Sequence, residues 1–514
     1  MNVPRLPLCL GGLGKGRLLP RPRSFCSSPA SQRVCIVGSG PSGFYSAKYL
    51  MKSHPGVKVD MIERLPTPFG LVRFGVAPDH PEVKSVINDF EKVAQSENFR
   101  FFGNVRVGSD VSLRELRDTY DAVVLASGAP GEKSLGVEGE DLPGVFSARR
   151  FVGWYNVHPD ASDLLVSPFL QRGDQAVVIG HGNVALDVAR VLTKRVEALE
   201  KTDISKQATD ALRNSKIRHV HVMGRRGPAQ ASFTNKELRE LLHEDGVVAA
   251  VDPKEFEKGM TNASREEIKD SRAKKRSLEL FEKMAENWGR VESGSLDPDE
   301  RVVQIRFLLS PVRIEAGDAG GLGVSLQRMT LEGAAGAQRA KGEEGAAGGV
   351  ERLGAALVVK SVGYAVEPLE GLPTSGGKGK SPPVPHTAGK VEVEVEVEEE
   401  GDDSKEAGGR TTTEEKTLCP LFVVGWLKRG PSGVIATNIP DAQETVGSLV
   451  KALAERGRGG ERAGVESLLQ ERATRYLPWS AWMRLKEEEA RRGEALGKSA
   501  SKIGSVDEML RLLS

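Results

Sequence analysis

A strand, a glycine-rich turn and a helix follow one another near residue 40 of this sequence, and they constrain its fold more than any other feature. Four apolar residues at 34–37 predict a buried strand, and glycines then follow at the spacing GxGxxG: Gly38, Gly40 and Gly43. The first glycine of such a turn permits a tight bend, the second lets the backbone approach a pyrophosphate, and the third lets the helix pack closely on the strand. The helix expected at about 44–52 directs its positive end at the phosphates.

An acidic residue stands where this kind of turn requires one. Residues 57–63 predict the next strand, which ends in Glu63, 20 residues after Gly43. A carboxylate at this place accepts hydrogen bonds from the ribose of an adenine nucleotide. A lone GxGxxG is weak evidence, but strand, turn, helix, strand and acid together predict that the first domain binds a dinucleotide.

A second fingerprint lies further along the chain. Residues 176–185 again indicate strand, turn and helix, and the matching strand at 217–223 ends in Gly-Arg-Arg-Gly. Arg225 and Arg226 therefore stand where the first unit has Glu63. Arginines pair bidentately with a 2′-phosphate, which a carboxylate would repel. This difference predicts NADP(H) at the second site and FAD at the first, with two solvated surface arginines as the alternative.

Length and composition narrow the remaining possibilities. The 514 residues are enough for two or three domains, and the formal net charge of +1 gives no reason to expect nucleic-acid binding. No apolar run approaches the roughly 20 residues that span a bilayer. The four cysteines show neither CxxC nor metal-ligand spacing, so we expect no disulfide framework and no metal site: Cys9, Cys26, Cys35 and Cys419.

Residues 1–32 have the composition of a targeting segment. They hold five basic residues and no acid, and the first acidic residue in the chain is Asp60. An arginine-rich, acid-poor leader is typical of a mitochondrial transit peptide. A disordered tail is the alternative.

Between the motifs the sequence predicts further elements. We expect an ordered apolar loop at 68–81 that either lines the pocket of a reactive ring or only packs the core. A helix is expected at 83–93, strands at 101–107, 122–126 and 421–425, a helix opening at 433–435, and helices at 466–513 anchored by Trp479 and Trp482. We predict no role for the excursion at 193–215, the segment that lengthens the second unit between its helix and its matching strand.

Six stretches resemble one known family. They are GSGPSGFYSAKYL, PFGLVRFGVAPDHPEVK, LPGVFSARRFVGWYN, GHGNVALDVARVL, GRRGPAQASFTNKELRE and GWLKRGPSGVIATN, and they reach from residue 34 to about 446. On these residues the chain resembles the mitochondrial NADPH:adrenodoxin (ferredoxin) oxidoreductase family. The resemblance implies an α/β fold with two Rossmann-like dinucleotide-binding domains, similar to glutathione reductase, in which the NADP domain is inserted in a discontinuous FAD domain.

The resemblance also implies a division of the chain. After the transit peptide we expect the first segment of the FAD-binding domain at 33–131, the NADP-binding domain at 132–362 and the second segment of the FAD-binding domain at 363–514. An acidic low-complexity insertion at about 392–416 and a Gly/Ala-rich segment at 317–349 match the family poorly, and we attach no function to either.

The family's motifs carry over residue by residue to two sets of nucleotide contacts. FAD is expected at Gly38, Gly40, Ser42, Gly43, Glu63, Leu71, Val107, Trp426, Gly433, Val434 and Ile435. NADP(H) is expected at His181, Gly182, Asn183, Val184, Arg225, Arg226, Glu237 and Gly433. Ser42 replaces the family's usual Ala, and His181 replaces its usual Gln, which introduces a titrating group. By spacing alone Trp426 is as readily a core residue as a ligand.

The chemistry implied by the resemblance takes place on the flavin. Hydride arrives from NADPH and single electrons leave to a [2Fe–2S] ferredoxin (adrenodoxin) that supplies mitochondrial haem monooxygenases and iron–sulfur cluster assembly. No catalytic side chain is expected. His80 and Glu237 are weak candidates for a proton path near the nicotinamide. The implied location is the mitochondrial matrix, with peripheral association with the inner membrane left open.

The resemblance implies that an acidic ferredoxin docks on basic residues of the NADP domain, and a basic stripe there is the candidate surface. At helical spacing Arg265, Lys269, Arg272 and Arg276 would share one face, and Arg272 and Arg276 are the expected partner contacts. A merely solvated helix face is the alternative. Two other functions stay open: an NADPH-dependent flavin disulfide reductase, which needs a cysteine pair beside the flavin, and a non-catalytic scaffold that binds FAD and NADP.

Overall fold

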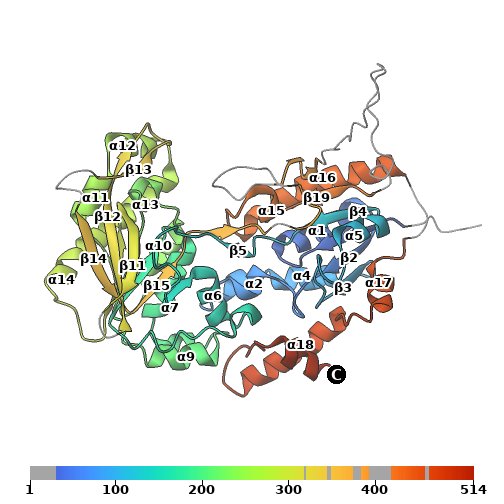
Figure 1. The fold of residues 1–514 in the computed structure, drawn as a ribbon, viewed down its shortest axis with the longest axis horizontal. Coiled ribbons are helices and arrows are strands. Elements are labelled where there is room, and N and C mark those ends of the chain that lie inside the picture. Colours follow the sequence, from blue (N-terminus) through green and yellow to red (C-terminus); the bar gives the residue numbers. More distant parts are fainter. Residues whose placement is uncertain are drawn as a thin grey trace, which may run out of the picture.

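The computed structural model describes residues 31–317, 320–343, 349–367, 369–373, 384–392, 418–457 and 462–514. The predicted transit peptide and acidic insertion lie almost wholly outside these residues. The chain forms two lobes, and the antiparallel strand pair β5 (Gly131–Glu132) and β16 (Tyr364–Ala365) runs between them (Figure 1).

The first lobe contains a seven-stranded sheet built from two distant regions of the chain. Its strand order is β17-β18-β19-β4-β1-β2-β3, in which β19, β4, β1, β2 and β3 run parallel. The strands are β1 (Arg33–Val37), β2 (Lys58–Ile62), β3 (Phe99–Phe102), β4 (Ala122–Leu125), β17 (His386–Thr387), β18 (Lys390–Val391) and β19 (Leu421–Val423). The helices α1 (Pro41–Ser53) and α16 (Asn438–Arg456) pack against each other beside this sheet.

The second lobe contains a six-stranded parallel sheet of order β6-β15-β7-β8-β10-β9. The strands are β6 (Val145–Ser147), β7 (Gln175–Ile179), β8 (His219–Met223), β9 (Val247–Val251), β10 (Arg301–Arg306) and β15 (Leu357–Lys360). An antiparallel sheet joins it: β11 (Leu309–Ala316), β12 (Leu322–Glu332), β13 (Arg339–Gly342) and β14 (Val350–Ala355). Because all these strands lie between β4 and β19 in the chain, the second domain is inserted in the first. The predicted fold class is confirmed, whereas the boundaries at 131 and 362 remain predictions.

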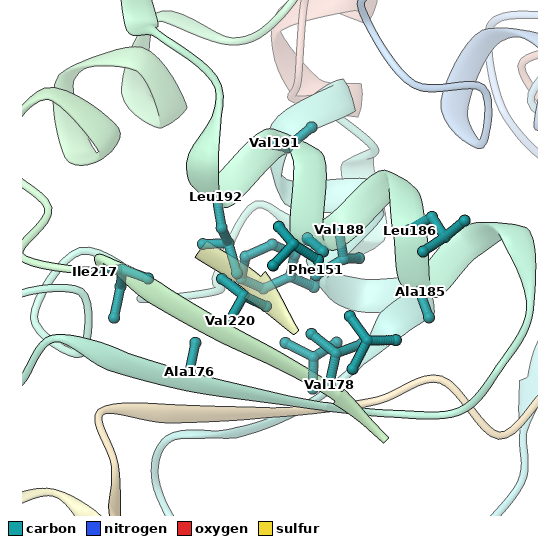
Figure 2. Packing of buried hydrophobic residues seen from close by; sticks show 14 of the residues in the cluster. Phe151, Ala176, Val178, Ala185, Leu186, Val188, Val191, Leu192, Ile217 and Val220 are labelled. Atoms are coloured by element: carbon teal, nitrogen blue, oxygen red, sulfur yellow. The ribbon is translucent and has the colours of Figure 1, made fainter. Parts of the chain in front are cut away.

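The second lobe's core shows why the helix after the second glycine turn forms where the sequence predicts. In α7 (Asn183–Thr193) the apolar residues Ala185, Val188 and Leu192 recur at helical spacing and are fully buried. Figure 2 shows these side chains gathered over Val178 and Val220 of the sheet, together with Phe151 of α6 (Ala148–Asn156). This packing holds the start of α7 at the carboxyl end of β7.

Three local predictions in the first lobe were wrong. The segment at 68–81 contains a helical turn, α2 (Leu71–Phe74), which the positive φ angles of Phe69 (84°) and Gly70 (47°) introduce. The helix expected at 83–93 is two helices, α3 (Pro81–Lys84) and α4 (Ile87–Ala94). The strand expected at 101–107 ends at Phe102, since Asn104 adopts a left-handed conformation with a φ of 62°.

The remaining elements agree more closely with the sequence. The excursion at 193–215 forms α8 (Val196–Leu199) and α9 (Lys206–Arg213). Near 433–435 a 3₁₀ turn (Ile435–Thr437) precedes α16. The tail is helical as predicted: α17 (Val465–Glu471), α18 (Trp479–Glu494) and α19 (Val506–Leu512). Among the described residues no helix is both long and apolar enough to cross a bilayer.

A buried ion pair fastens the tail to the first lobe. The Arg73 guanidinium lies 2.6 Å from the Glu489 carboxylate, and both side chains are at most 7% exposed. The same carboxylate oxygen accepts a hydrogen bond from the backbone of Ile503 at 2.8 Å. The guanidinium also lies 5.0 Å from the ring of Trp482. One carboxylate therefore neutralises a buried cation and orders the chain after α18.

Replacing Glu489 with Ala should destabilise the protein by about 3–5 kcal/mol, because it leaves Arg73 buried without its counter-ion. Urea-induced unfolding followed by circular dichroism measures the loss. The neighbouring Glu488 is a matched control, since it pairs with Arg491 and Arg492 on the surface of α18. Glu488→Ala should change the unfolding midpoint far less. Equal effects of the two substitutions would contradict the anchoring role.

Candidate nucleotide-binding site

The first glycine of each turn has the same kind of surroundings, whereas the third position is Gly43 in the first lobe and Ala185 in the second. A methyl group added at Gly38 would lie 2.5 Å from the carbonyl oxygen of Ala126, and one at Gly43 would lie 2.1 Å from that of Gly38. The second lobe repeats this, since a methyl at Gly180 would lie 2.1 Å from the carbonyl oxygen of Ser361. These positions are closed to any side chain because protein backbone already fills the space.

The middle glycine of each turn has the opposite surroundings. No described atom lies within 4 Å of a methyl group built on Gly40 or on Gly182. Each of these glycines caps the start of a helix, α1 and α7 respectively, whose first turn carries no acidic residue. Exposed backbone at the positive end of a helix is the surface that a pyrophosphate requires. Each lobe therefore fits one dinucleotide.

Glu63 lies at the carboxyl end of β2, beside the first turn. Its Oε2 atom accepts hydrogen bonds from the backbone N–H of Ser39 at 3.1 Å and from the Ser39 hydroxyl at 2.7 Å. Its Oε1 atom accepts a hydrogen bond from the Leu65 backbone at 3.1 Å. These bonds hold the carboxylate next to the glycine turn, at the position expected for a ribose contact.

The other predicted FAD residues also gather at the carboxyl edge of the first sheet. Leu71 begins α2 directly after Gly70, where an added methyl would lie 3.3 Å from the Cα of Gly40. Val107 lies in the loop after β3 and packs on the core. The side chain of Ser42 faces Gly425, where an added methyl would lie 2.6 Å from its hydroxyl. The residues Gly433, Val434 and Ile435 lie in the segment that leads into α16.

Trp426 occupies the start of a short helix, α15 (Trp426–Arg429), immediately after β19. Its indole N–H donates to the carbonyl of Ser432 at 3.1 Å, and its ring lies 5.0 Å from the ring of Tyr364. The preceding N–H, that of Gly425, donates to Asp441 at 2.6 Å. Sequence reasoning missed Tyr364 and Asp441, because each comes from a distant segment and neither belongs to a motif.

A cavity of about 590 Å³ lies at the second turn. Its lining includes the predicted residues His181, Gly182, Arg225 and Arg226. Both arginines are exposed and make no ion pair with any described residue. Asn183 is held by another contact, since its side-chain oxygen accepts the N–H of Thr234 at 2.8 Å. Val184 follows it in the first turn of α7 and packs partly buried against the lobe's core.

His181 turns its ring away from solvent. The ring lies 5.3 Å from that of Phe233 and 5.2 Å from that of Phe307. Burial lowers its pKa from the ordinary 6.5 to about 4. The imidazole is therefore neutral at pH 7, and the added pH dependence considered from sequence has no source there at this pH.

Glu237 does not line that cavity but belongs to a cluster between the lobes. Its carboxylate lies 3.3 Å from the Arg190 guanidinium. His80, from the first lobe, lies 2.8 Å from Glu240 and 3.9 Å from Glu237. The ligand atoms of His80, Glu237 and Glu240 lie within 4.8 Å of one another, but the guanidinium of Arg190 lies 3.1 Å from the same imidazole nitrogen. A positive group already fills the place that a metal cation would take.

Charge in this cluster is balanced across the lobe boundary. Arg190 has no exposed side-chain surface and also binds Asp79 of the first lobe at 2.8 Å. It holds the pKa of Asp79 well below its usual range, although burial opposes this. Burial raises the pKa of the neighbouring Asp187 to about 6, against the effect of Arg190. Only the tertiary structure identifies Glu240 and Arg190 as partners of His80.

The predicted basic stripe is wrong as a single face. Arg265 and Lys269 belong to α12 (Asn262–Lys269), whereas Arg272 and Arg276 belong to α13 (Arg272–Glu286), and the helix is interrupted between them. Ser271 accepts the N–H of Lys274 and starts the second helix. Arg265 and Lys269 pair with acids of their own lobe, each at 2.5 Å. Arg272 and Arg276 stay exposed, one turn apart, without an ion pair to any described residue.

The described cysteines do not form a redox pair. Cys35 and Cys419 are both free and fully buried. Burial raises the pKa of the Cys35 thiol well above its ordinary value and that of Cys419 to about 12. Since the thiolate is the reactive form, neither residue is prepared for disulfide exchange. Cys9 and Cys26 lie outside the described residues.

Comparison with known proteins supplies the family. The sequence is 44% identical to an Arabidopsis thaliana protein named NADPH:adrenodoxin oxidoreductase, mitochondrial, over 94% of this chain and 96% of the relative. It is 41% identical to the Homo sapiens protein of the same name, over 95% and 94%. This chain belongs to the NADPH:adrenodoxin oxidoreductase family.

Two further comparisons agree with that membership. The profile of the family described as Pyridine nucleotide-disulphide oxidoreductase matches residues 32–259. The solved structure described as Mycobacterium tuberculosis FprA in complex with NADPH is 39% identical, with a TM-score of 0.79 over 94% of this chain and 99% of that one. The predicted family, its two-domain α/β fold and its class, an oxidoreductase with FAD and NADP(H) as cofactors, are confirmed.

His181→Gln should alter acid stability and leave the pH dependence of nucleotide binding near neutral pH unchanged. Below pH 6.5 the unfolded state takes up a proton that the native imidazole, with its pKa of about 4, refuses. Stability is therefore lost as pH falls from 6.5 to 4. The variant lacks this loss, so its melting temperature should fall less steeply across that window. A pH-dependent difference in NADPH binding between pH 7 and 8 would contradict a buried, neutral imidazole.

Proposed function

We propose that this protein takes hydride from NADPH, bound at the second turn, and passes electrons singly to a [2Fe–2S] ferredoxin through FAD bound at the first turn. The observation that carries the proposal is the difference between two otherwise matched turns: Glu63 faces one, and Arg225 and Arg226 face the other. Bound flavin supplies the conversion of a two-electron donor into single-electron steps. The protein itself holds both nucleotides and excludes water.

The proposed contacts are those the sequence predicts. The backbone of Gly40 and Gly182 faces the two pyrophosphates, and Glu63 takes a ribose of FAD. Trp426 and the segment 433–435 border the flavin. Glu237 acts within the cluster between the lobes, where its bond to Arg190 gives it a positioning role. No side chain is proposed as a nucleophile.

The ferredoxin is proposed to dock on the exposed start of α13. Arg272 and Arg276 are exposed there and make no ion pair with a described residue, so their charge is available to an acidic surface. The names of the relatives support a ferredoxin or adrenodoxin partner and a mitochondrial location. We propose the matrix, with peripheral association with the inner membrane. The electrons would supply haem monooxygenases and iron–sulfur cluster assembly.

The two alternative functions make different demands. A disulfide reductase requires a reactive cysteine pair, and the two described thiols are buried with raised pKa values. Replacing every cysteine should leave ferredoxin reduction intact. A scaffold would bind FAD without turnover, so bleaching of the yellow protein by NADPH separates it from an enzyme.

Changing Arg225 and Arg226 together to Ala should weaken NADPH binding by about 2–5 kcal/mol, the range for two charge-assisted contacts with some non-additivity. NADH lacks the 2′-phosphate and should be affected little. Steady-state reduction of a small dye, titrated with each nucleotide, measures both. Comparable losses for the two nucleotides would show that the arginines support the fold instead of selecting the nucleotide.

Electron transfer to a small [2Fe–2S] ferredoxin tests the function itself. The FAD-loaded protein, once reduced by NADPH, should reduce the ferredoxin. Charge reversal at Arg272 and Arg276 should raise the ferredoxin concentration needed for half-maximal turnover and should flatten the dependence of that concentration on ionic strength. Lys254, exposed on another helix, α11 (Pro253–Gly259), is a control for added negative charge. Dye reduction should stay intact. No reduction by the unaltered protein would refute the function, and unchanged salt dependence in the variant would refute only the docking site.

A further inference from the structure

The nucleotide cavity of the second lobe contains a cation that no motif predicts. Among its lining residues, Lys133, Arg225 and Arg226 are positively charged and none is acidic. Lys133 is exposed and makes no ion pair with any described residue. Nearby Lys360, by contrast, lies 3.4 Å from Glu140. The ammonium group of Lys133 is therefore uncommitted, at the edge of a cavity suited to an anion.

Lys133 lies beside residues 361–363, the segment that packs against the second glycine turn. It follows β5, and its backbone N–H donates to the carbonyl of Gly363 at 3.3 Å. A methyl group added at Gly363 would lie 3.7 Å from the Lys133 Nζ atom. Two residues earlier, the carbonyl of Ser361 makes the close contact with Gly180. The ammonium group thus lies beside the turn that faces the pyrophosphate.

Sheet order separates Lys133 from the arginine pair. Strand β7, which carries the glycine turn, lies between β15 and β8. Lys133 and residues 361–363 lie on the side of β15, whereas Arg225 and Arg226 follow β8. A dinucleotide laid across the turn would meet the arginines on one side and Lys133 on the other.

The charges of the nucleotide indicate what Lys133 would contact. If the arginines take the 2′-phosphate, the pyrophosphate's two negative charges face only the start of α7, worth roughly half a positive charge. The first turn of α7 contains no basic residue. We propose that Lys133 is a binding residue for the pyrophosphate of NADP(H). This inference rests on the proposed function, because it adds a contact to the same nucleotide.

Titration of the oxidised, FAD-loaded protein with NADP⁺ and with NAD⁺, followed by calorimetry, tests the assignment. Both ligands carry the pyrophosphate, and only NADP⁺ carries the 2′-phosphate. Lys133→Met should raise the Kd of both by the same factor, roughly 10-fold for one lost charge-assisted contact. Lys133→Arg should restore most of the loss. Arg225→Ala should weaken NADP⁺ alone.

Lys216 provides the matched control. It is an exposed lysine just before β8, so it lies at the amino ends of the strands, opposite the glycine turn, and it does not line the cavity. Lys216→Met should leave both dissociation constants unchanged. Unchanged constants in Lys133→Met would overturn the proposal, and so would a loss confined to NADP⁺, which would make Lys133 a 2′-phosphate ligand. Failure of the unaltered protein to bind either nucleotide or to be bleached by NADPH would refute the proposed function instead.

Discussion

Both nucleotide turns depend on one close approach of backbone to backbone, which leaves no room for a side chain on the first glycine. A methyl group added at Gly38 would lie 2.5 Å from the carbonyl oxygen of Ala126 after β4, and one at Gly180 would lie 2.1 Å from that of Ser361 after β15. Any side chain at these glycines would push the neighbouring strand away. The contact lets the turn bend sharply into the helix, and it leaves the following glycine facing open space. The helix position, the exposed backbone and the site for a pyrophosphate all follow from it.

Opposite electrostatics then distinguish two sites of the same backbone geometry. At the first turn Glu63 is held by Ser39, and at the second the charged residues of the cavity lining are all cations. Since both helices begin at a glycine and have no acidic residue in the first turn, we expect side-chain charge to separate a nucleotide with a 2′-phosphate from one without. In the proposed function the fold supplies the phosphate sites, and a few residues at strand ends select the nucleotide.

Ionic contacts also determine how the lobes meet. Arg190 of the second lobe binds Asp79 of the first, and His80 of the first lobe binds Glu240 of the second. A second contact uses the excursion at 193–215, for which the sequence offered no role. Its Asp203 lies 2.6 Å from Lys84 and 2.8 Å from Lys502, so three separate segments of the chain meet at one carboxylate. Burial lowers the pKa of Lys502 to about 7.

The sequence by itself determined the two dinucleotide folds, the strands and helices around both turns, and the difference between Glu63 and the arginine pair. These are local properties, because glycine spacing, apolar periodicity and charge at a strand end are read within one strand–turn–helix–strand unit. Only the tertiary structure decided which distant residues lie beside the motifs: Tyr364 packs against Trp426, Asp441 accepts the N–H of Gly425, and Lys133 lies beside Gly363. It also divided the basic stripe, where the helix ends between Lys269 and Arg272. Periodicity gives the face of a continuous helix, whereas contacts between separate segments depend on how the sheets are ordered and packed.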